Sequence, residues 1–160
     1  MIYTITGPRS VGKTTISKRL AKKIKLNYIS SDEIGEKVFE KEGGLDKAIK
    51  SGKIGNFINN SSYGLIRREY EKDNFVFDLS GGAFTSEKYS EASKKVRKIA
   101  KKNSKIIGIL PSKNEEKSIN FLFEREKNRI HFKKMCDEEL FNKTKKDYVK
   151  FEPLFKEFCD

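Results

Sequence analysis

The feature that most constrains the fold is a glycine-containing loop, Gly7–Thr14, which separates an apolar run from a helical pattern. Its sequence, Gly-Pro-Arg-Ser-Val-Gly-Lys-Thr, is a glycine, four residues and then Gly-Lys-Thr, which is the Walker A spacing. Residues 2–5 before it, Ile-Tyr-Thr-Ile, are typical of a buried strand, and residues 15–24 after it place apolar side chains at helical spacing. A strand that runs through such a loop into a helix indicates an α/β fold.

The residues of this loop also predict phosphate binding. Its backbone N–H groups can surround phosphate oxygens, and the N-terminus of the following helix adds a partial positive charge. Lys13 would neutralise the β- and γ-phosphates of ATP, and the Thr14 hydroxyl would reach Mg²⁺. The alternative is a chance turn, and the flanking strand and helix argue against it. The residues expected to hold ATP here are Gly7, Pro8, Arg9, Ser10, Val11, Gly12, Lys13, Thr14 and Thr15.

The rest of the chain alternates short apolar runs with helical patterns. Strands are expected at 26–30, 75–79 and 106–110, and helices at about 31–42, 45–50, 54–71, 87–102, 114–125 and 137–158. Parallel strands need long crossovers, which helices usually supply, so we predict a three-layer, doubly wound parallel sheet. The loops after Ile5, Ser30, Leu79 and Leu110 should converge on one cleft, because ligands bind beyond the carboxyl ends of such strands.

Composition narrows the class further. The 160 residues fit one domain, and 35 Lys+Arg against 23 Asp+Glu give a formal net charge of +12, which favours anionic partners. Of the 35 basic residues 28 are lysines dispersed along the chain, which is typical of solvated helix faces. With no leader and no apolar run of about 18 residues, we expect a cytoplasmic monomer without a membrane partner. Two cysteines and one histidine exclude a disulfide framework and a His-based metal site.

Two carboxylates follow predicted strands. Asp78 lies near the end of an apolar strand, where it could hold a Mg²⁺-bound water, or it could be a simple edge or capping acid. Asp32 follows the second predicted strand, where it could take a proton from an acceptor hydroxyl. A helix N-cap is the structural alternative for Asp32, and one residue can serve both roles.

Glycines and arginines supply the remaining candidates. Gly81 and Gly82 would let the backbone approach a small substrate, or form an ordinary strand-to-helix turn. Arg125 and Arg129 could form a closing arm that brings guanidinium groups onto the phosphates, with a solvated helix end as the alternative. His131 by itself suggests packing or capping rather than catalysis.

Taken together, these motifs resemble the shikimate kinase family, within the small P-loop kinases that include adenylate and cytidylate kinases. The similarity runs over nearly the whole chain: residues 28–33 resemble the family's Asp-x-Asp motif, 80–83 its triple-glycine turn, 121–125 the start of its lid, and 152–157 its C-terminal Pro-Leu-Tyr segment. The resemblance implies a sheet of about five parallel strands, use of MgATP, and regions that close around the reactants. It assigns Asp32 to the acceptor, the glycine turn to the same acceptor, and Arg125 to the ATP phosphates.

The chain departs from the family pattern at acceptor-binding positions. Ser30 stands where the first Asp of the motif would be, and Asp78 could replace that carboxylate. Phe151 stands where the family has an arginine that grips the shikimate carboxylate, and no arginine lies at positions 56–60, where a second one is expected. Arg67-Arg68 would have to supply it from further along the chain. Phe or Asn cannot replace a bidentate guanidinium–carboxylate pair, so the resemblance supports a kinase more strongly than shikimate as its acceptor.

We therefore predict a single P-loop kinase domain over residues 1–160, with a lid at about 125–134 and an acceptor-binding region at about 32–71. Its expected activity is transfer of the γ-phosphoryl group of ATP, with Mg²⁺, to a hydroxyl of an anionic or hydroxylated small molecule. The catalytic candidates are Lys13, Asp32 and Arg125, with Arg129 on ATP, Gly81 and Gly82 on the acceptor, and Thr14 and Asp78 on the metal.

Two other functions stay open at this point. A nucleoside monophosphate kinase would need arginines facing the acceptor phosphate, and Arg67, Arg68 and Arg129 are the candidates. A nucleotide-dependent nucleic-acid-binding factor or a polynucleotide 5′-hydroxyl kinase would account for the net charge, although no known nucleic-acid module is present.

Overall fold

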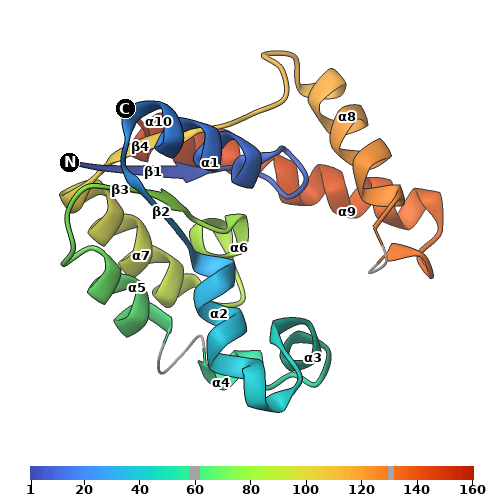
Figure 1. The fold of residues 1–160 in the computed structure, drawn as a ribbon. Coiled ribbons are helices and arrows are strands. Elements are labelled where there is room, and N and C mark those ends of the chain that lie inside the picture. Colours follow the sequence, from blue (N-terminus) through green and yellow to red (C-terminus); the bar gives the residue numbers. More distant parts are fainter. Residues whose placement is uncertain (58–61, 130–131) are drawn as a thin grey trace.

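The structure, a computed structural model, describes residues 1–57, 62–129 and 132–160. Its strands form a parallel sheet in the order β2-β3-β1-β4 (Figure 1). The strands are β1 (Ile2–Thr6), β2 (Asn27–Ser30), β3 (Phe75–Asp78) and β4 (Lys105–Gly108). In the register Ile5 lies beside Asp78 on one side and Ile107 on the other. The carboxyl ends of the strands therefore meet at one edge, as the sequence predicted.

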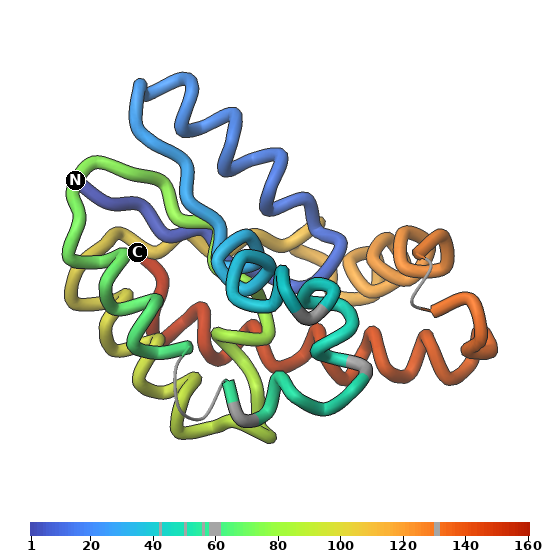
Figure 2. The backbone as a smooth tube through the Cα atoms, turned by 60° about the horizontal axis from the view of Figure 1, so that its bottom comes forward, coloured from blue at the N-terminus to red at the C-terminus, as the bar shows by residue number. Residues whose placement is uncertain are grey.

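Helices cover both faces of the sheet. In chain order they are α1 (Lys13–Ile24), α2 (Ser31–Phe39), the 3₁₀ turn η1 (Glu40–Glu42), α3 (Leu45–Lys50), α4 (Ile54–Phe57), α5 (Tyr63–Glu69), α6 (Gly81–Thr85), α7 (Ser90–Asn103), α8 (Glu115–Lys127), α9 (Asp137–Tyr148) and α10 (Phe151–Phe158). Figure 2 shows α1 on one face and α5, α7 and α10 on the other, while α8 and α9 extend together beyond the sheet. The predicted three-layer α/β architecture is confirmed.

Strand β3 lies at the centre of the packing. Phe75, Val76 and Phe77 are at most 1% exposed because helices cover both faces of this strand. Tyr70 packs edge-on against Phe77, with ring centroids 5.3 Å apart, and Phe75 does the same at 6.0 Å. The Tyr70 hydroxyl shares a 2.8 Å hydrogen bond with the Thr4 hydroxyl. The polar end of the ring is thus satisfied inside an otherwise apolar cluster.

The sheet has four strands in the described part of the chain, rather than about five. The reason is that the sequence after residue 114 is rich in Lys and Glu at helical spacing and forms α8, α9 and α10. The outer edge of β4 is instead met by Asp160: its backbone N–H donates to the Ile106 carbonyl at 2.9 Å, and its carboxylate accepts from the Ile106 N–H at 2.7 Å. These bonds satisfy backbone groups of Ile106 that a neighbouring strand would otherwise pair.

Several predicted helices have different bounds. The helix expected at 54–71 appears as α4 and α5, with 58–61 outside the described residues. The helix expected at 137–158 breaks between α9 and α10. Gly81 and Gly82 open a separate short helix, α6, because the Ser80 hydroxyl accepts a hydrogen bond from the Ala83 N–H and caps it.

Several surface lysines are paired with neighbouring glutamates. Lys72, Lys94 and Lys156 pair with Glu69, Glu91 and Glu152 at helical or turn spacing on exposed faces. Such exposed pairs mark solvated surface rather than a continuous basic groove. Within the described residues, no helix is both long enough and apolar enough to cross a bilayer.

Replacing Phe77 by Ala should lower the free energy of unfolding by about 3–5 kcal/mol, because it opens a cavity between two rings in the most buried strand. Urea denaturation would measure the change. Phe121→Ala is the control, since that ring is 46% exposed on α8 and its loss should change stability by less than about 1 kcal/mol. Equal losses in the two variants would contradict this description of the core.

Candidate active site

The loop between β1 and α1 has the backbone shape of a phosphate cradle. Gly12 at the N-cap of α1 has φ +99°, and no side chain caps the helix, so its first N–H groups face the cleft without a side-chain acceptor. Ser10 also has a positive φ, +63°, and its Oγ is buried without a hydrogen-bond partner in the described residues. An uncapped helix start beside a buried, unpaired hydroxyl fits a phosphate group.

Lys13 lies over this loop. Its ammonium donates to the carbonyls of Gly7 and Pro8, both at 3.1 Å. Burial lowers the pKa of Lys13, while the negative charges of Asp78 and Asp32 oppose that shift. The ammonium is therefore close enough to both carboxylates to feel their charge, and its own partners are two neutral carbonyls.

Asp78, at the end of β3, faces the start of α1. The Thr14 hydroxyl donates to Asp78 Oδ2 at 2.7 Å, and the Tyr28 hydroxyl donates to the same oxygen at 3.2 Å. Burial raises the pKa of Tyr28 to about 12, so this hydroxyl remains a donor. A hydroxyl and a carboxylate in direct contact after β1 and β3 are the donor set that Mg²⁺ uses beside phosphates. The described residues contain no cluster of three or more His, Cys, Asp or Glu that would bind a metal alone.

Asp32 lies in the first turn of α2 and lines both of the cavities described below. The N-cap of this helix is Ser30, whose hydroxyl accepts from the Glu33 N–H at 3.4 Å. Asp32 is therefore free of the capping role that the sequence left open, and the serine in place of the family's first Asp has a structural use. Limited hydration, followed by the charge of Asp78, raises the pKa of Asp32, against the opposing effect of Lys13 and Arg129.

Gly81 and Gly82 have different roles. A Cβ on Gly81 would lie 2.7 Å from the Gly7 carbonyl oxygen and 3.0 Å from Phe151 Cζ, so the glycine allows the loop and α6 to touch. A Cβ on Gly82 would meet nothing within 4 Å, and this residue faces the open cleft. Gly81 is therefore needed for backbone packing. Both glycines line the larger cavity described below, and their contact with a ligand stays a prediction.

The two predicted arm arginines approach the site from the end of α8. Arg125 Nη1 lies 3.8 Å from where a Cβ of Gly12 would be, and its guanidinium stacks over the Phe121 ring at 5.4 Å. Arg129 lines the cleft near Lys13 and Asp32. The predicted lid at about 125–134 is described only in part, and His131 lies outside the described residues.

Arg9 has partners that the sequence did not predict. Its guanidinium lies 3.6 Å from the buried carboxylate of Glu126 and 3.3 Å from that of Asp147, and it stacks over Phe132 at 4.9 Å. The Thr144 hydroxyl donates to Glu126 at 3.3 Å. The Arg9 guanidinium therefore links the loop Gly7–Thr14, here called the phosphate loop, to both α8 and α9.

A cavity of about 490 Å³, here called the cationic cavity, joins these groups. Lys13, Asp32, Gly82 and Arg129 line it, together with side chains that sequence reasoning missed. Chief among the missed residues is Lys150, which lies 3.4 Å from Glu87 and 3.7 Å from Asp147. Its position at the break between α9 and α10 follows from tertiary packing and has no local motif.

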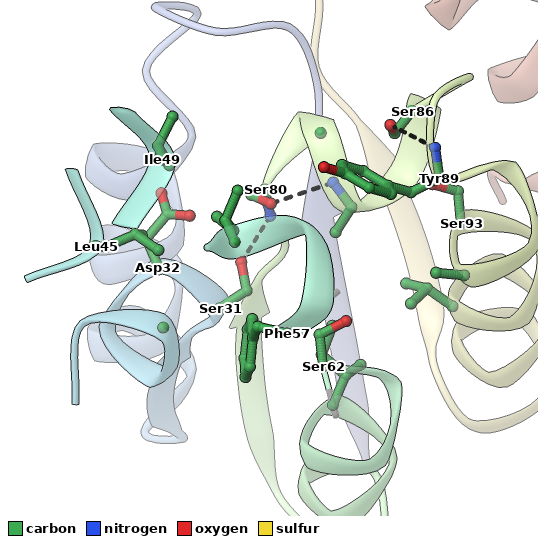
Figure 3. A pocket seen from close by; sticks show the side chains of 17 residues that line it. Ser31, Asp32, Leu45, Ile49, Phe57, Ser62, Ser80, Ser86, Tyr89 and Ser93 are labelled. Atoms are coloured by element: carbon green, nitrogen blue, oxygen red, sulfur yellow. Dashed lines mark hydrogen bonds between the residues drawn. The ribbon is translucent and has the colours of Figure 1, made fainter. Parts of the chain in front are cut away.

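A second cavity of about 350 Å³, here called the apolar cavity, continues from the first on the side of α2–α5. Asp32, Ser80, Gly82 and Ser86 line both cavities. Figure 3 shows Asp32 directed into the apolar cavity from one side and Tyr89 crossing another side. Ser31 holds this junction, because its hydroxyl donates to the Asp78 carbonyl and accepts from the Ser80 N–H at 2.8 Å.

Two of the three arginines considered for a phosphate acceptor, Arg67 and Arg68, lie away from the cavities. Arg67 pairs with Glu71 at 3.4 Å on the exposed side of α5, and neither Arg67 nor Arg68 lines either cavity. Phe151 is 3% exposed and stacks on Phe155 at 5.4 Å, so the position that the resemblance gives to an arginine forms a hydrophobic wall.

The chain is similar to known kinases in sequence and in fold. The sequence profile of the family described as shikimate kinase matches residues 9–152. Cytidine diphosphoramidate kinase of Campylobacter jejuni is 30% identical over 88 residues, which is 49% of this chain and 52% of that protein. The chain thus matches about half the length of this relative.

Solved structures show the same fold. Shikimate kinase from Bacteroides thetaiotaomicron has a TM-score of 0.76 at 18% identity, with 99% of this chain and 83% of that chain covered. Shikimate kinase from Acinetobacter baumannii, solved in complex with shikimate, has a TM-score of 0.69 at 19% identity, covering 99% and 79%. The predicted resemblance is confirmed at the level of the family profile and the fold.

The two glycines allow a matched test of the site. Gly81→Ala should lower stability by about 1–3 kcal/mol, because the new methyl group would press on the Gly7 carbonyl and displace the phosphate loop. It should also weaken ADP binding, measured by calorimetry. Gly82→Ala has open space around the new methyl group and should retain both stability and ADP affinity. Similar behaviour of the two variants would refute the close packing of loop and α6.

Proposed function

The chain belongs to the shikimate kinase family, and from this premise we propose that it transfers the γ-phosphoryl group of ATP to a hydroxyl of a small molecule. The observation that carries the proposal is the position of Asp32. Its carboxylate lines the cationic cavity together with Lys13 and also opens into the apolar cavity. A base between a phosphate-binding lysine and a second cavity is what transfer between two bound substrates requires.

In the proposed reaction, Asp32 accepts the proton of the acceptor hydroxyl as that oxygen bonds to the γ-phosphorus. The bond between the γ-phosphorus and the bridging oxygen to the β-phosphate breaks, and ADP leaves with that electron pair. Lys13 exchanges its two carbonyl partners for phosphate oxygens and neutralises their charge. Arg125, in the last turn of α8, and Arg129, two residues beyond this helix, supply further positive charge to the same oxygens.

We also propose that Thr14 and Asp78 hold Mg²⁺. The ion would neutralise charge on the β- and γ-phosphates when MgATP is bound. Thr14 and Asp78 already contact each other at 2.7 Å, so an ion bound beside them would replace this hydrogen bond, while the Tyr28 hydroxyl can still donate to Asp78. Ser30 does not take part, because it caps α2.

A hydroxyl acceptor fits the site better than a phosphate acceptor. A nucleoside monophosphate kinase needs guanidinium groups on the acceptor side, and two of the three candidates, Arg67 and Arg68, lie outside both cavities. The third, Arg129, lines the cationic cavity, where the proposed reaction uses it on the ATP phosphates. A polynucleotide acceptor needs a continuous basic track, and the 28 lysines are dispersed along the chain, three of them in exposed local pairs with glutamates. We therefore propose a small-molecule kinase that acts as one P-loop domain over the whole chain.

A coupled assay of ADP release tests this proposal. Acceptor-stimulated ADP release should appear with at least one member of a panel of shikimate, sugars, polyols, nucleosides and nucleotides. Lys13→Ala should reduce it at least about 100-fold, because the charge that develops on the phosphates is no longer neutralised. Lys22→Ala, on the exposed side of the same helix, should keep the parent rate. No stimulation by any acceptor, or a normal rate in Lys13→Ala, would overturn the proposal.

The pH profile tests Asp32. The ionised carboxylate is the active form, so kcat/KM should rise with pH through the Asp32 pKa, at a pH above the ordinary aspartate value of about 3.9. Asp32→Asn should lower kcat about 10²–10⁴-fold with little change in the KM for ATP. Because a raised pKa means that ionised Asp32 is less stable in the folded state, the variant should be no less stable than the parent at neutral pH. An equal loss of ATP binding would make Asp32 a metal-binding or structural residue instead.

A further inference from the structure

The apolar cavity restricts what the acceptor can be. Side chains from four helices form its walls: Leu45 and Ile49 from α3, Phe57 from α4, Ile66 from α5 and Val96 from α7. It joins the cationic cavity at Asp32, the proposed base. An acceptor hydroxyl at Asp32 therefore leaves the rest of the acceptor molecule in contact with these walls.

The charge of the cavity excludes an anionic group deep inside it. Among the described residues that line it there is no Lys, Arg or His, and the one charged side chain is Asp32. A carboxylate placed there would lose its hydration without gaining a cation and would lie near a like charge. The portion of the acceptor that fills this cavity must therefore be uncharged.

The neighbouring cations line the cationic cavity and not the apolar one: Lys13, Lys88, Arg129 and Lys150. Lys150 lies in the cationic cavity and is paired with Glu87 and Asp147. Phe151 next to it belongs to the hydrophobic core. The wall contains no side chain suited to the carboxylate of a small acid, which a guanidinium would bind in two-point fashion.

Shape and remaining polarity favour a flat ring with polar edges. The aromatic side chains of Tyr89 and Phe57 lie at different sides of the cavity (Figure 3). Aromatic walls favour planar groups, because stacking uses the face of a ring. Ser93 adds a hydroxyl-bearing residue to the lining, which can serve a ring nitrogen or a carbonyl oxygen. Saturated polyhydroxylated acids match neither feature.

We propose that the acceptor is a nucleoside-type alcohol, whose uncharged heterocyclic ring fills the apolar cavity while a sugar hydroxyl lies at Asp32. This inference rests on the proposed function, because it takes Asp32 as the group that receives the hydroxyl proton. A volume of about 350 Å³ is within the usual range for sites that enclose small organic ligands. Any anionic substituent of the acceptor lies toward Arg129 and Lys150 in the cationic cavity.

The test compares neutral ring compounds with an acid. Cytidine, uridine, adenosine, guanosine, shikimate and methyl shikimate would be assayed for ADP release, and for a shift in melting temperature in the presence of ADP and Mg²⁺. At least one nucleoside should exceed shikimate at least tenfold in kcat/KM, and the neutral ester should exceed its acid. Preference for shikimate over every nucleoside, or no nucleoside binding in either measurement, would overturn the inference.

A pair of variants locates the binding. Ile49→Asp places a charge on the cavity wall at a residue 51% exposed, so the fold should tolerate it. It should raise the KM for the preferred nucleoside at least tenfold and remove the melting shift, without changing the KM for ATP. Val38→Asp, at a residue 43% exposed on α2 outside both cavities, should change none of these values. Equal effects of the two variants would overturn the assignment of the ring to this cavity.

The outcomes separate the two proposals. Phosphoryl transfer to shikimate alone would retain the kinase and reject the nucleoside. Nucleoside binding that Ile49→Asp abolishes, without ADP release for any acceptor, would retain the ring site and reject the kinase.

Discussion

The site depends on a direct backbone contact at the carboxyl edge of the sheet. The phosphate loop leaves β1 so close to α6 that Gly81 can carry no side chain, and Gly7 meets the Ile109 carbonyl beyond β4 in the same way. Parallel strands bring these three segments to one edge, and the two glycines let them touch. This contact also helps to position Lys13 and Asp78. Lys13 follows Gly7 by a few residues along the chain, and Asp78 precedes Gly81 by a few.

Electrostatics divides the cleft into two regions. Lys13 lies between Asp78 and Asp32, so one cation stabilises two carboxylates that would otherwise repel each other. Away from this group toward α9 and α10, the charges of Lys150 and Asp147 continue. Toward α3–α5 the lining is hydrophobic, and Asp32 stands at the boundary. A molecule that spans the boundary is recognised by charge at one end and by shape at the other.

The fold class and part of the site were predictable from local sequence patterns. The other features of the site depend on tertiary packing, which such patterns do not contain. The loop Gly7–Thr14 and the apolar strand before Asp78 carry strong short-range patterns, so the α/β class and the meeting of Lys13 with both acids followed from them. The apolar cavity could not be predicted in this way, because it is built from single faces of short helices whose orientation depends on tertiary packing. The capping role of Ser30 was likewise hidden, since Asp32 is an equally good N-cap by residue type. The four-stranded sheet differs from the family expectation because the last third of the chain has helical spacing.

Arg9 connects the loop Gly7–Thr14 with the two projecting helices α8 and α9. The guanidinium belongs to the phosphate loop, yet its carboxylate partners are Glu126 on α8 and Asp147 on α9, the latter 138 residues away in sequence. Glu126 is buried, so it depends on Arg9 and Thr144 for compensation. Because the same guanidinium contacts both carboxylates, Arg9 could turn toward a ligand in the loop only by giving up contacts with α8 and α9. A change in the position of α8 and α9 would therefore change the contacts of Arg9, and with them the surroundings of the loop Gly7–Thr14.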